Sequence, residues 1–339
     1  MLAKCSGLLS FVLSASTLLA ACGPTAGVAP TPTPLPAKPE EPVPALPTSA
    51  KPAASPAASP AASPAASPAA GADVLASERP LSPMPPPGNM PEGSYMRTIQ
   101  DRGRLIAGVK DDVRLFGFLN PRTSQIEGFD VDIVKEIARA IFGDESNLEL
   151  KAVTSAQRIP ELNAGTVDLV AATMTVTAAR KQEIDFSEVY YKAVQKVLVR
   201  KNAPYTGIQD LSGKKVCAAK GSTSERNISA ANPQAEVVQT DKYPDCLLLL
   251  QQGRVDAIST DDVILAGLAD TDPDTKIVGE AFYDEPYGIG VAKNRPQFVA
   301  FINGVLQEIK SSSRWKEIHA RWLGKYSPTP EPPMGTYTS

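Results

Sequence analysis

The chain has 339 residues, a formal net charge of −3 and a single histidine. So mild a charge excludes the strongly basic surface that nucleic-acid binding requires, and we expect no nucleic-acid partner. The single histidine, His319, is expected to pack in the core, and one histidine is too few for a histidine metal site, so we expect no catalytic residue, no metal and no cofactor.

Residues 1–21 have the pattern of a secretory signal peptide, with Lys4 ahead of an apolar stretch from Leu8 to Leu19. That stretch is shorter than the roughly 20 residues that a membrane-spanning helix needs. The sequence Leu19-Ala-Ala-Cys22 resembles a bacterial lipobox, which implies cleavage before Cys22 and a lipid on it. The alternative is an ordinary secretory peptide that ends beside a cysteine. A lipid on Cys22 predicts a protein anchored to the cell membrane on its outer side.

Residues 22–94 are rich in proline, alanine and serine, and Ala-Ala-Ser-Pro repeats between residues 53 and 70. Proline removes backbone donors and fixes φ, so we predict that the lipidated cysteine is followed by a disordered linker. The folded domain is then predicted over residues 95–326, with a flexible proline-rich tail at residues 327–339.

Strands and helices are predicted to alternate through the first part of this domain. Leu105 to Val109 is a strand-like apolar run, and a helix with one apolar face follows Gly128. Further strands are predicted at Leu148 to Val153 and Val167 to Ala172, with a helix between them. Such alternation is typical of βαβ units in a parallel sheet.

The alternation occurs a second time after a strand at Val194 to Val199. Leu162 to Asp168 and Leu250 to Asp256 share the pattern Leu-x-x-Gly-x-Val-Asp, in which glycine ends a helix and a strand follows. We therefore predict two α/β lobes, the first over about 95–197 and 290–326, the second over about 198–289. The crossings between them are expected at Val194 to Arg200 and Gly288 to Ala292. Ligands of such sheets lie beyond the carboxyl ends of the strands.

Two cysteines, Cys217 and Cys246, remain in the exported domain. An even pair outside the cytoplasm favours a disulfide, and two separately buried thiols are the alternative. Residues Pro296 to Leu323 are predicted to form two helices, in which His319 shares an apolar face with Trp315 and is expected to pack in the core.

Polar clusters of opposite charge follow the two strands that begin at the repeated Leu-x-x-Gly-x-Val-Asp pattern. Thr173 to Arg180 brings hydroxyls and one guanidinium, whereas Thr260-Asp-Asp262 brings carboxylates. Arginine grips a carboxylate through paired hydrogen bonds, and an ionised aspartate accepts from an ammonium group, so together they suit a zwitterion. The alternative for Arg180 is a solvated surface arginine.

From about Thr98 to Leu323 the sequence resembles the family 3 extracellular solute-binding proteins, the polar amino-acid receptors of ABC importers. The resemblance is greatest to the glutamine- and glutamate-binding lipoproteins of actinobacteria. The matching motifs include Gly128-Phe-Asp-Val-Asp132, Ile184-Asp-Phe-Ser-Glu-Val-Tyr-Tyr191, Lys220-Gly-Ser-Thr-Ser224 and Pro286-Tyr-Gly-Ile289. It implies a two-lobed periplasmic-binding-protein fold of type II and no enzymatic activity.

By this resemblance, Arg180 would clamp the ligand α-carboxylate and Asp261 would receive the α-ammonium. Hydroxyl-bearing residues of both lobes would assist the clamp, namely Thr173, Thr175, Ser222 and Thr223. Phe116 would form an apolar wall, although Leu115-Phe116-Gly117 departs from the usual Pro-Phe pattern. Tyr243 is a candidate for a hydrogen bond at the rim.

Lys110 and Arg158 are the candidates for side-chain selectivity. Receptors of this family that take aspartate or glutamate tend to carry cations at these positions, and a buried cation left unpaired is costly. These residues favour glutamate, aspartate or glutamine as ligand. The alternative for Arg158 is exposure to water.

The implied mechanism is closure of the lobes on an amino acid, followed by docking of a monomer on an ABC permease in the membrane. An amino-acid sensor that reports to a membrane partner would use the same cleft and is the alternative.

Overall fold

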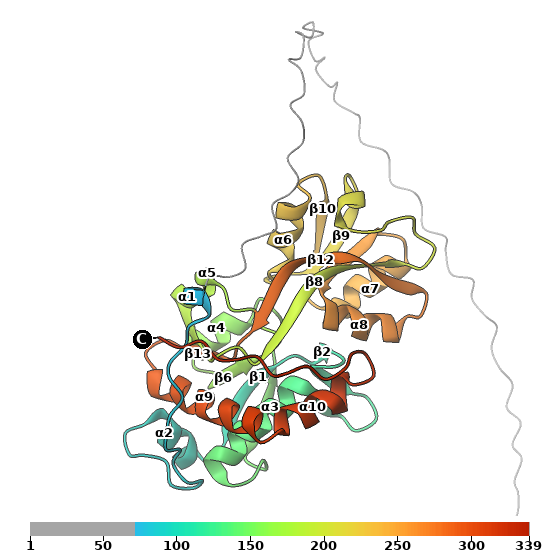
Figure 1. Ribbon diagram of the computed structural model, residues 1–339. Helices are drawn as coiled ribbons and strands as arrows, with labels where there is room; N and C mark the ends of the chain where they lie inside the picture. Colours follow the sequence, from blue (N-terminus) through green and yellow to red (C-terminus); the bar gives the residue numbers. More distant parts are fainter. Residues whose placement is uncertain (1–71, 339) are drawn as a thin grey trace, which may run out of the picture. The chain divides into compact units, whose positions relative to one another are not determined.

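A computed structural model describes residues 72–338. The predicted signal peptide, Cys22 and most of the predicted linker lie outside these residues. The described part contains two five-stranded sheets and one small three-stranded sheet (Figure 1). No helix among residues 72–338 is long and apolar enough to cross a membrane.

The first sheet has the order β5-β1-β6-β13-β7, with β1 parallel to both of its neighbours and β13 antiparallel to both of its own. Its strands are β1 (Leu105–Val109), β5 (Leu148–Ala152), β6 (Leu169–Ala171), β7 (Ile184–Phe186) and β13 (Gly290–Ala292). Its helices are α2 (Tyr95–Arg102), α3 (Phe129–Phe142), α4 (Arg158–Asn163), α5 (Ala178–Glu183), α9 (Pro296–Ser311) and α10 (Arg314–Leu323). A small sheet of β2 (Asp112–Val113), β3 (Gly117–Asn120) and β4 (Gln125–Glu127) belongs to the same lobe.

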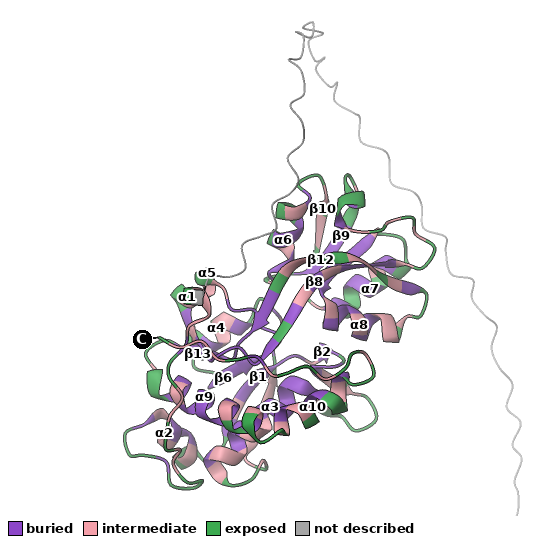
Figure 2. Ribbon diagram, viewed as in Figure 1, coloured by how far each residue is buried: buried purple, intermediate pink, exposed green. Residues whose placement is uncertain are grey.

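The second sheet has the order β10-β9-β11-β8-β12, in which β9 is parallel to β10 and β11 while β8 is antiparallel to β11 and β12. Its strands are β8 (Tyr191–Arg200), β9 (Lys215–Ala219), β10 (Glu236–Thr240), β11 (Ala257–Asp261) and β12 (Thr275–Tyr287). Its helices are η1 (Ile208–Leu211), α6 (Ser224–Ala231), α7 (Tyr243–Gln251) and α8 (Asp262–Thr271). Central strands of both sheets are buried, whereas exposed residues lie mainly in loops and on outer helix faces (Figure 2).

The repeated Leu-x-x-Gly-x-Val-Asp pattern occupies equivalent places in the two sheets. Asp168 pairs through its backbone and its carboxylate with Ile106 at the start of β1, at 2.8 Å in both bonds. Asp256 does the same with Lys215 at the start of β9, at 2.8 and 2.9 Å. The predicted α/β fold of two related lobes is therefore confirmed.

The crossings between the lobes differ in part from the prediction. Strand β8 pairs with the second sheet along its whole length, from Tyr191 to Arg200, so the chain crosses just before Tyr191 and not within Val194 to Arg200. The return crossing lies at Gly288 and Ile289, between β12 and β13, inside the predicted range. We call residues 72–190 and 288–338 the first lobe and residues 191–287 the second lobe.

Both ends of the described chain pack on the first lobe, which corrects the predicted domain limits. Ser77 forms a bridge with Tyr337, with backbone bonds of 2.8 Å to Thr336 and Thr338. Met90 is buried and Leu81 donates to the carbonyl of Ala300 at 2.8 Å. Residues from α1 (Ala72–Leu75) to 94 therefore belong to the folded lobe and not to a linker, and residues 327–338 are not a free tail. Prolines prevent regular structure there, but isolated apolar side chains still reach the core.

Cys217 and Cys246 form a disulfide between β9 and α7, with Cα atoms 5.6 Å apart, as predicted. His319 is buried and packs against Trp315, with ring centroids 5.2 Å apart, which confirms its structural role.

Candidate functional site

The predicted site residues follow the carboxyl ends of five strands. Lys110 follows β1, Arg158 follows β5, Thr173 and Thr175 follow β6, Ser222 and Thr223 follow β9, and Asp261 ends β11. Four helices then begin close by, so their N-terminal backbone N–H groups also face this region. The α/β topology therefore gathers these groups where the two lobes meet.

Arg180 lies on α5 and connects the two lobes. Its Nη1 donates to the carbonyl of Thr175 at 2.8 Å, and its Nη2 donates to the carbonyl of Gly221, in the second lobe, at 3.2 Å. Burial, followed by the nearby charge of Arg158, lowers the pKa of Arg180 to about 9. At neutral pH it is still a cation, and it can receive a ligand carboxylate.

Arg158 is 2% exposed, so the alternative that it faces water is wrong. Its guanidinium donates to four backbone carbonyls at 3.0 to 3.3 Å, those of Ser155, Ala172, Thr173 and Gly221. Because most of its N–H groups already have acceptors, Arg158 joins the lobes and leaves little donor capacity for a ligand side chain.

Asp261 is buried at the end of β11 and accepts a hydrogen bond from the hydroxyl of Tyr287. Burial, and then the neighbouring carboxylate of Glu285, raises the pKa of Asp261 well above its usual value. A cation beside Asp261 would relieve this cost, which suits its predicted role as the acceptor for an α-ammonium.

Glu285, near the end of β12, is a site residue that sequence reasoning missed. Its Oε2 accepts from the hydroxyls of Thr175 and Thr223, the latter at 2.8 Å, and its Oε1 accepts from Asn227 at 2.8 Å. The hydroxyls assigned to the ligand therefore donate to a protein carboxylate. The signal available was an acidic residue immediately before the Pro286-Tyr-Gly motif.

Lys110 and Asp112 form a buried ion pair, with 3.0 Å between Nζ and Oδ1 and side chains 0% and 3% exposed. Neither of these two atoms has a well-aligned hydrogen-bond partner within residues 72–338. Burial lowers the pKa of Lys110, and Asp112 opposes this shift. The backbone N–H of Tyr243 donates to Asp112 at 3.1 Å, and Lys110 lies 5.6 Å from the Tyr243 ring centre, so the pair lies at the boundary between lobes.

Ser222 and Thr223 precede α6, where they present different groups. Ser222 Oγ is buried and has no partner in the described part of the chain. Thr223 occupies the N-cap position of α6 without a side-chain cap bond, and the first-turn N–H groups of this helix lack intrahelical acceptors and attract an anion. An α-carboxylate held by Arg180 would suit this end of α6.

Thr173 and Phe116 support the site from the first lobe. Thr173 has a positive φ of 45°, and its N–H donates to Asp130 at 2.8 Å. Phe116 is fully buried against Tyr287, with ring centres 5.7 Å apart, so it backs the tyrosine that binds Asp261. No cluster of three or more metal-binding side chains occurs among residues 72–338.

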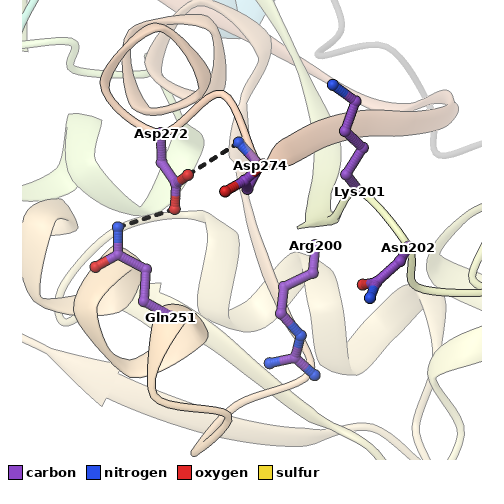
Figure 3. Close-up of a pocket in the computed structure, with 6 residues that line it drawn as sticks. All are labelled: Arg200, Lys201, Asn202, Gln251, Asp272 and Asp274. Atoms are coloured by element: carbon purple, nitrogen blue, oxygen red, sulfur yellow. Dashed lines mark hydrogen bonds between the residues drawn. The ribbon is translucent and has the colours of Figure 1, made fainter.

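A separate pocket of about 660 Å³ lies at the far end of β8, beside Arg200, Lys201, Asn202, Gln251, Asp272 and Asp274 (Figure 3). Asp272 accepts there from Gln251 at 2.8 Å and from the backbone of Asp274 at 3.0 Å. No buried, unpartnered side-chain atom belongs to these six residues. The pocket contains none of the predicted site residues.

Comparison with known proteins gives a family match. Residues 105–325 match the family described as bacterial extracellular solute-binding proteins, family 3. The chain belongs to this family. It is 44% identical over 229 residues to the ABC transporter glutamine-binding protein GlnH of Bacillus subtilis, covering 67% of this chain and 84% of that protein.

Other similar proteins are named for glutamate or for arginine. The glutamate-binding protein GluB of Corynebacterium glutamicum is 30% identical over 239 residues, covering 67% of this chain and 81% of that protein. An ancestral arginine-binding protein bound to glutamine has 35% identity and a TM-score of 0.62, covering 66% of this chain and 99% of that structure. As a family 3 protein, this chain is a solute receptor and not an enzyme.

Proposed function

We propose that this chain is the amino-acid receptor of an ABC importer and that it prefers L-glutamine to glutamate or aspartate. Arg180 and the start of α6 bind the α-carboxylate, and Asp261 binds the α-ammonium. The closed lobes then dock on the permease in the membrane. A relative named as an ABC transporter glutamine-binding protein supports the transport role, and a second named as a glutamine-binding protein supports the ligand.

The buried Lys110–Asp112 pair determines the preference for a carboxamide over a carboxylate side chain. A carboxamide has one oxygen that accepts and one NH₂ that donates, which matches an ammonium beside a carboxylate. The γ-carboxylate of glutamate would instead meet the negative charge of Asp112. Arg158 adds positive charge nearby, but it offers such a carboxylate few free donors because it is hydrogen-bonded to four carbonyls.

Calorimetric titration of the full chain with all common amino acids tests this preference. We expect a Kd for glutamine near or below about 1 μM. Asp112→Asn removes the negative charge and replaces one accepting oxygen by a donating NH₂ group, so glutamine affinity should fall by about tenfold while the preference over glutamate shrinks or reverses. An unchanged ratio of the two affinities would contradict the role of this pair.

Asp111→Asn is the matched control for that experiment. Asp111 is the neighbouring aspartate, and its carboxylate pairs with Lys242 of the second lobe at 2.7 Å. Its loss should affect closure on either ligand equally and leave the ratio of affinities unchanged.

We also propose that Cys22 carries a lipid that anchors the receptor outside the cell membrane. The Leu19-Ala-Ala-Cys22 sequence supports this. Cys22→Ser should move the protein from the membrane fraction to the soluble extracytoplasmic fraction on cell fractionation. Retention in the membrane fraction would contradict the anchor.

A further inference from the structure

Glu285 links the two lobes directly beneath the groups that we assign to the ligand α-carboxylate. The side chain is 1% exposed and belongs to β12 of the second lobe, two residues before the chain leaves that strand. One oxygen accepts from Thr175 in the first lobe and from Thr223 in the second. The two threonine hydroxyl oxygens lie 3.5 Å apart, with the carboxylate between them.

The bonds around Glu285 extend into the second lobe. Its other oxygen accepts from Asn227 on α6, and the same Asn227 nitrogen donates to Gln195 on β8 at 2.8 Å. Gln195 in turn donates to Ser259 on β11 at 2.9 Å. Glu285 is therefore held in one orientation by three elements of the second lobe, and it presents its remaining acceptor capacity to Thr175.

The backbone around Thr175 forms the first-lobe side of this contact between the lobes. The Thr175 carbonyl accepts from Arg180. The N–H of Val176 donates to the carbonyl of Pro286, near the end of β12, at 2.8 Å, and the N–H of Gly288 donates to the carbonyl of Met174 at 3.0 Å. When the Thr175 hydroxyl donates to Glu285, this loop is fixed relative to the start of α6. The hydrogens of both hydroxyls are then occupied, which leaves Arg180, backbone N–H groups and the Ser222 hydroxyl, unpartnered within residues 72–338, to hold the ligand.

We propose that Glu285 is a positioning residue for ligand binding, which keeps the Thr175 loop of the first lobe in register with the N-terminus of α6. This inference rests on the proposed amino-acid receptor function. It assigns the hydroxyls of Thr175 and Thr223 to Glu285 and not to direct donation to the ligand.

Glu285→Gln tests the proposal in the full chain purified in detergent, with glutamine titrated calorimetrically. The new NH₂ group would face either Asn227 Nδ2, where a donor would meet a donor, or the threonine hydroxyls, which would have to accept instead of donate. We expect affinity to fall by about tenfold. Glu188→Gln is the control, because Glu188 is a buried glutamate of the first lobe that binds Lys310 and Gln307. It should leave affinity unchanged.

A double-mutant cycle with Thr175→Val separates positioning from direct contact. If Thr175 acts through Glu285, its loss should cost little affinity once Glu285→Gln is present. Fully additive losses would mean that the Thr175 hydroxyl binds the ligand itself, and would overturn the proposal. Equal affinity of Glu285→Gln and Glu188→Gln would also overturn it.

Two further results complete the test. If wild type binds no amino acid, the proposed function itself fails, which is distinct from a failure of Glu285 alone. If Glu285→Gln does not fold, the single variants Thr175→Val and Thr223→Val replace it. Each should weaken glutamine binding, and unchanged affinity in both would overturn the role of Glu285.

Discussion

Asp130 shows how one buried carboxylate supports the site without being predicted to touch a ligand. It is fully buried on α3 and accepts from the Thr173 N–H at 2.8 Å and from the Tyr190 hydroxyl at 2.7 Å. These bonds fix Thr173 in its positive-φ conformation, and Thr173 in turn presents its carbonyl to Arg158. Burial raises the pKa of Asp130 from 3.8 to about 7, although both hydrogen bonds oppose the shift.

This shift predicts a pH dependence of stability. Between about pH 4 and pH 7 the folded protein keeps the Asp130 proton while the unfolded chain loses it. The free energy of unfolding should therefore fall as pH rises through this window, by up to about 1.4 kcal/mol per pH unit from this group. Below and above the window, Asp130 should not make the free energy of unfolding depend on pH. Asp130→Asn cannot titrate and should lack this component.

Urea unfolding of wild type and Asp130→Asn across this pH range measures the difference. Other groups contribute equally to both proteins, so the variant should gain stability relative to wild type as pH rises towards 7. Parallel stability curves would contradict the raised pKa.

At the scale of elements, periodicity predicted the strands better than the ends of the chain. Strand β1 matches the predicted Leu105 to Val109, and β5 ends one residue earlier than the predicted Leu148 to Val153, because the length of such segments favours strands over helices. Residues 72–94 contain many prolines and no periodic pattern, yet they pack on the first lobe. Their contacts are with α3, α9 and the C-terminal segment, which only the tertiary fold brings near.

Sequence motifs identified some of the site residues but not others. Arg180 and Asp261 follow strands and carry recognisable motifs, so the sequence indicated them. Glu285 matters because the fold places it beside Thr175, which is distant in sequence, and such a pair leaves no local pattern to recognise. Asp112 lies two residues after Lys110, but only the tertiary fold buries the two side chains together.

At the scale of the whole molecule, the two lobes meet through a small set of contacts around Gly221. Its carbonyl accepts from both Arg158 and Arg180, and its backbone lies against Ala156 of the first lobe. Further bonds join Lys242 to Asp111 and Tyr243 to Asp112. A ligand favours closure only if it binds the closed form better, so these contacts set how much of its binding energy closure requires.

Gly221→Ala should therefore weaken ligand binding by obstructing closure. A Cβ at this position would lie 2.7 Å from the Cα and 2.9 Å from the N of Ala156, backbone atoms that cannot rotate away. The lobes would have to separate, and we expect glutamine affinity to fall by about tenfold or more.

Gly213→Ala is the control, because Gly213 also has a positive φ and lies in the same lobe, but its Cβ would meet no atom within 4 Å. Both variants carry a backbone cost of about 1–2 kcal/mol, which thermal unfolding measures. Only Gly221→Ala should also lose affinity in calorimetric titration, together with a larger radius of gyration than wild type at saturating glutamine. If the two variants bind glutamine equally well, the contact between Gly221 and Ala156 does not limit closure.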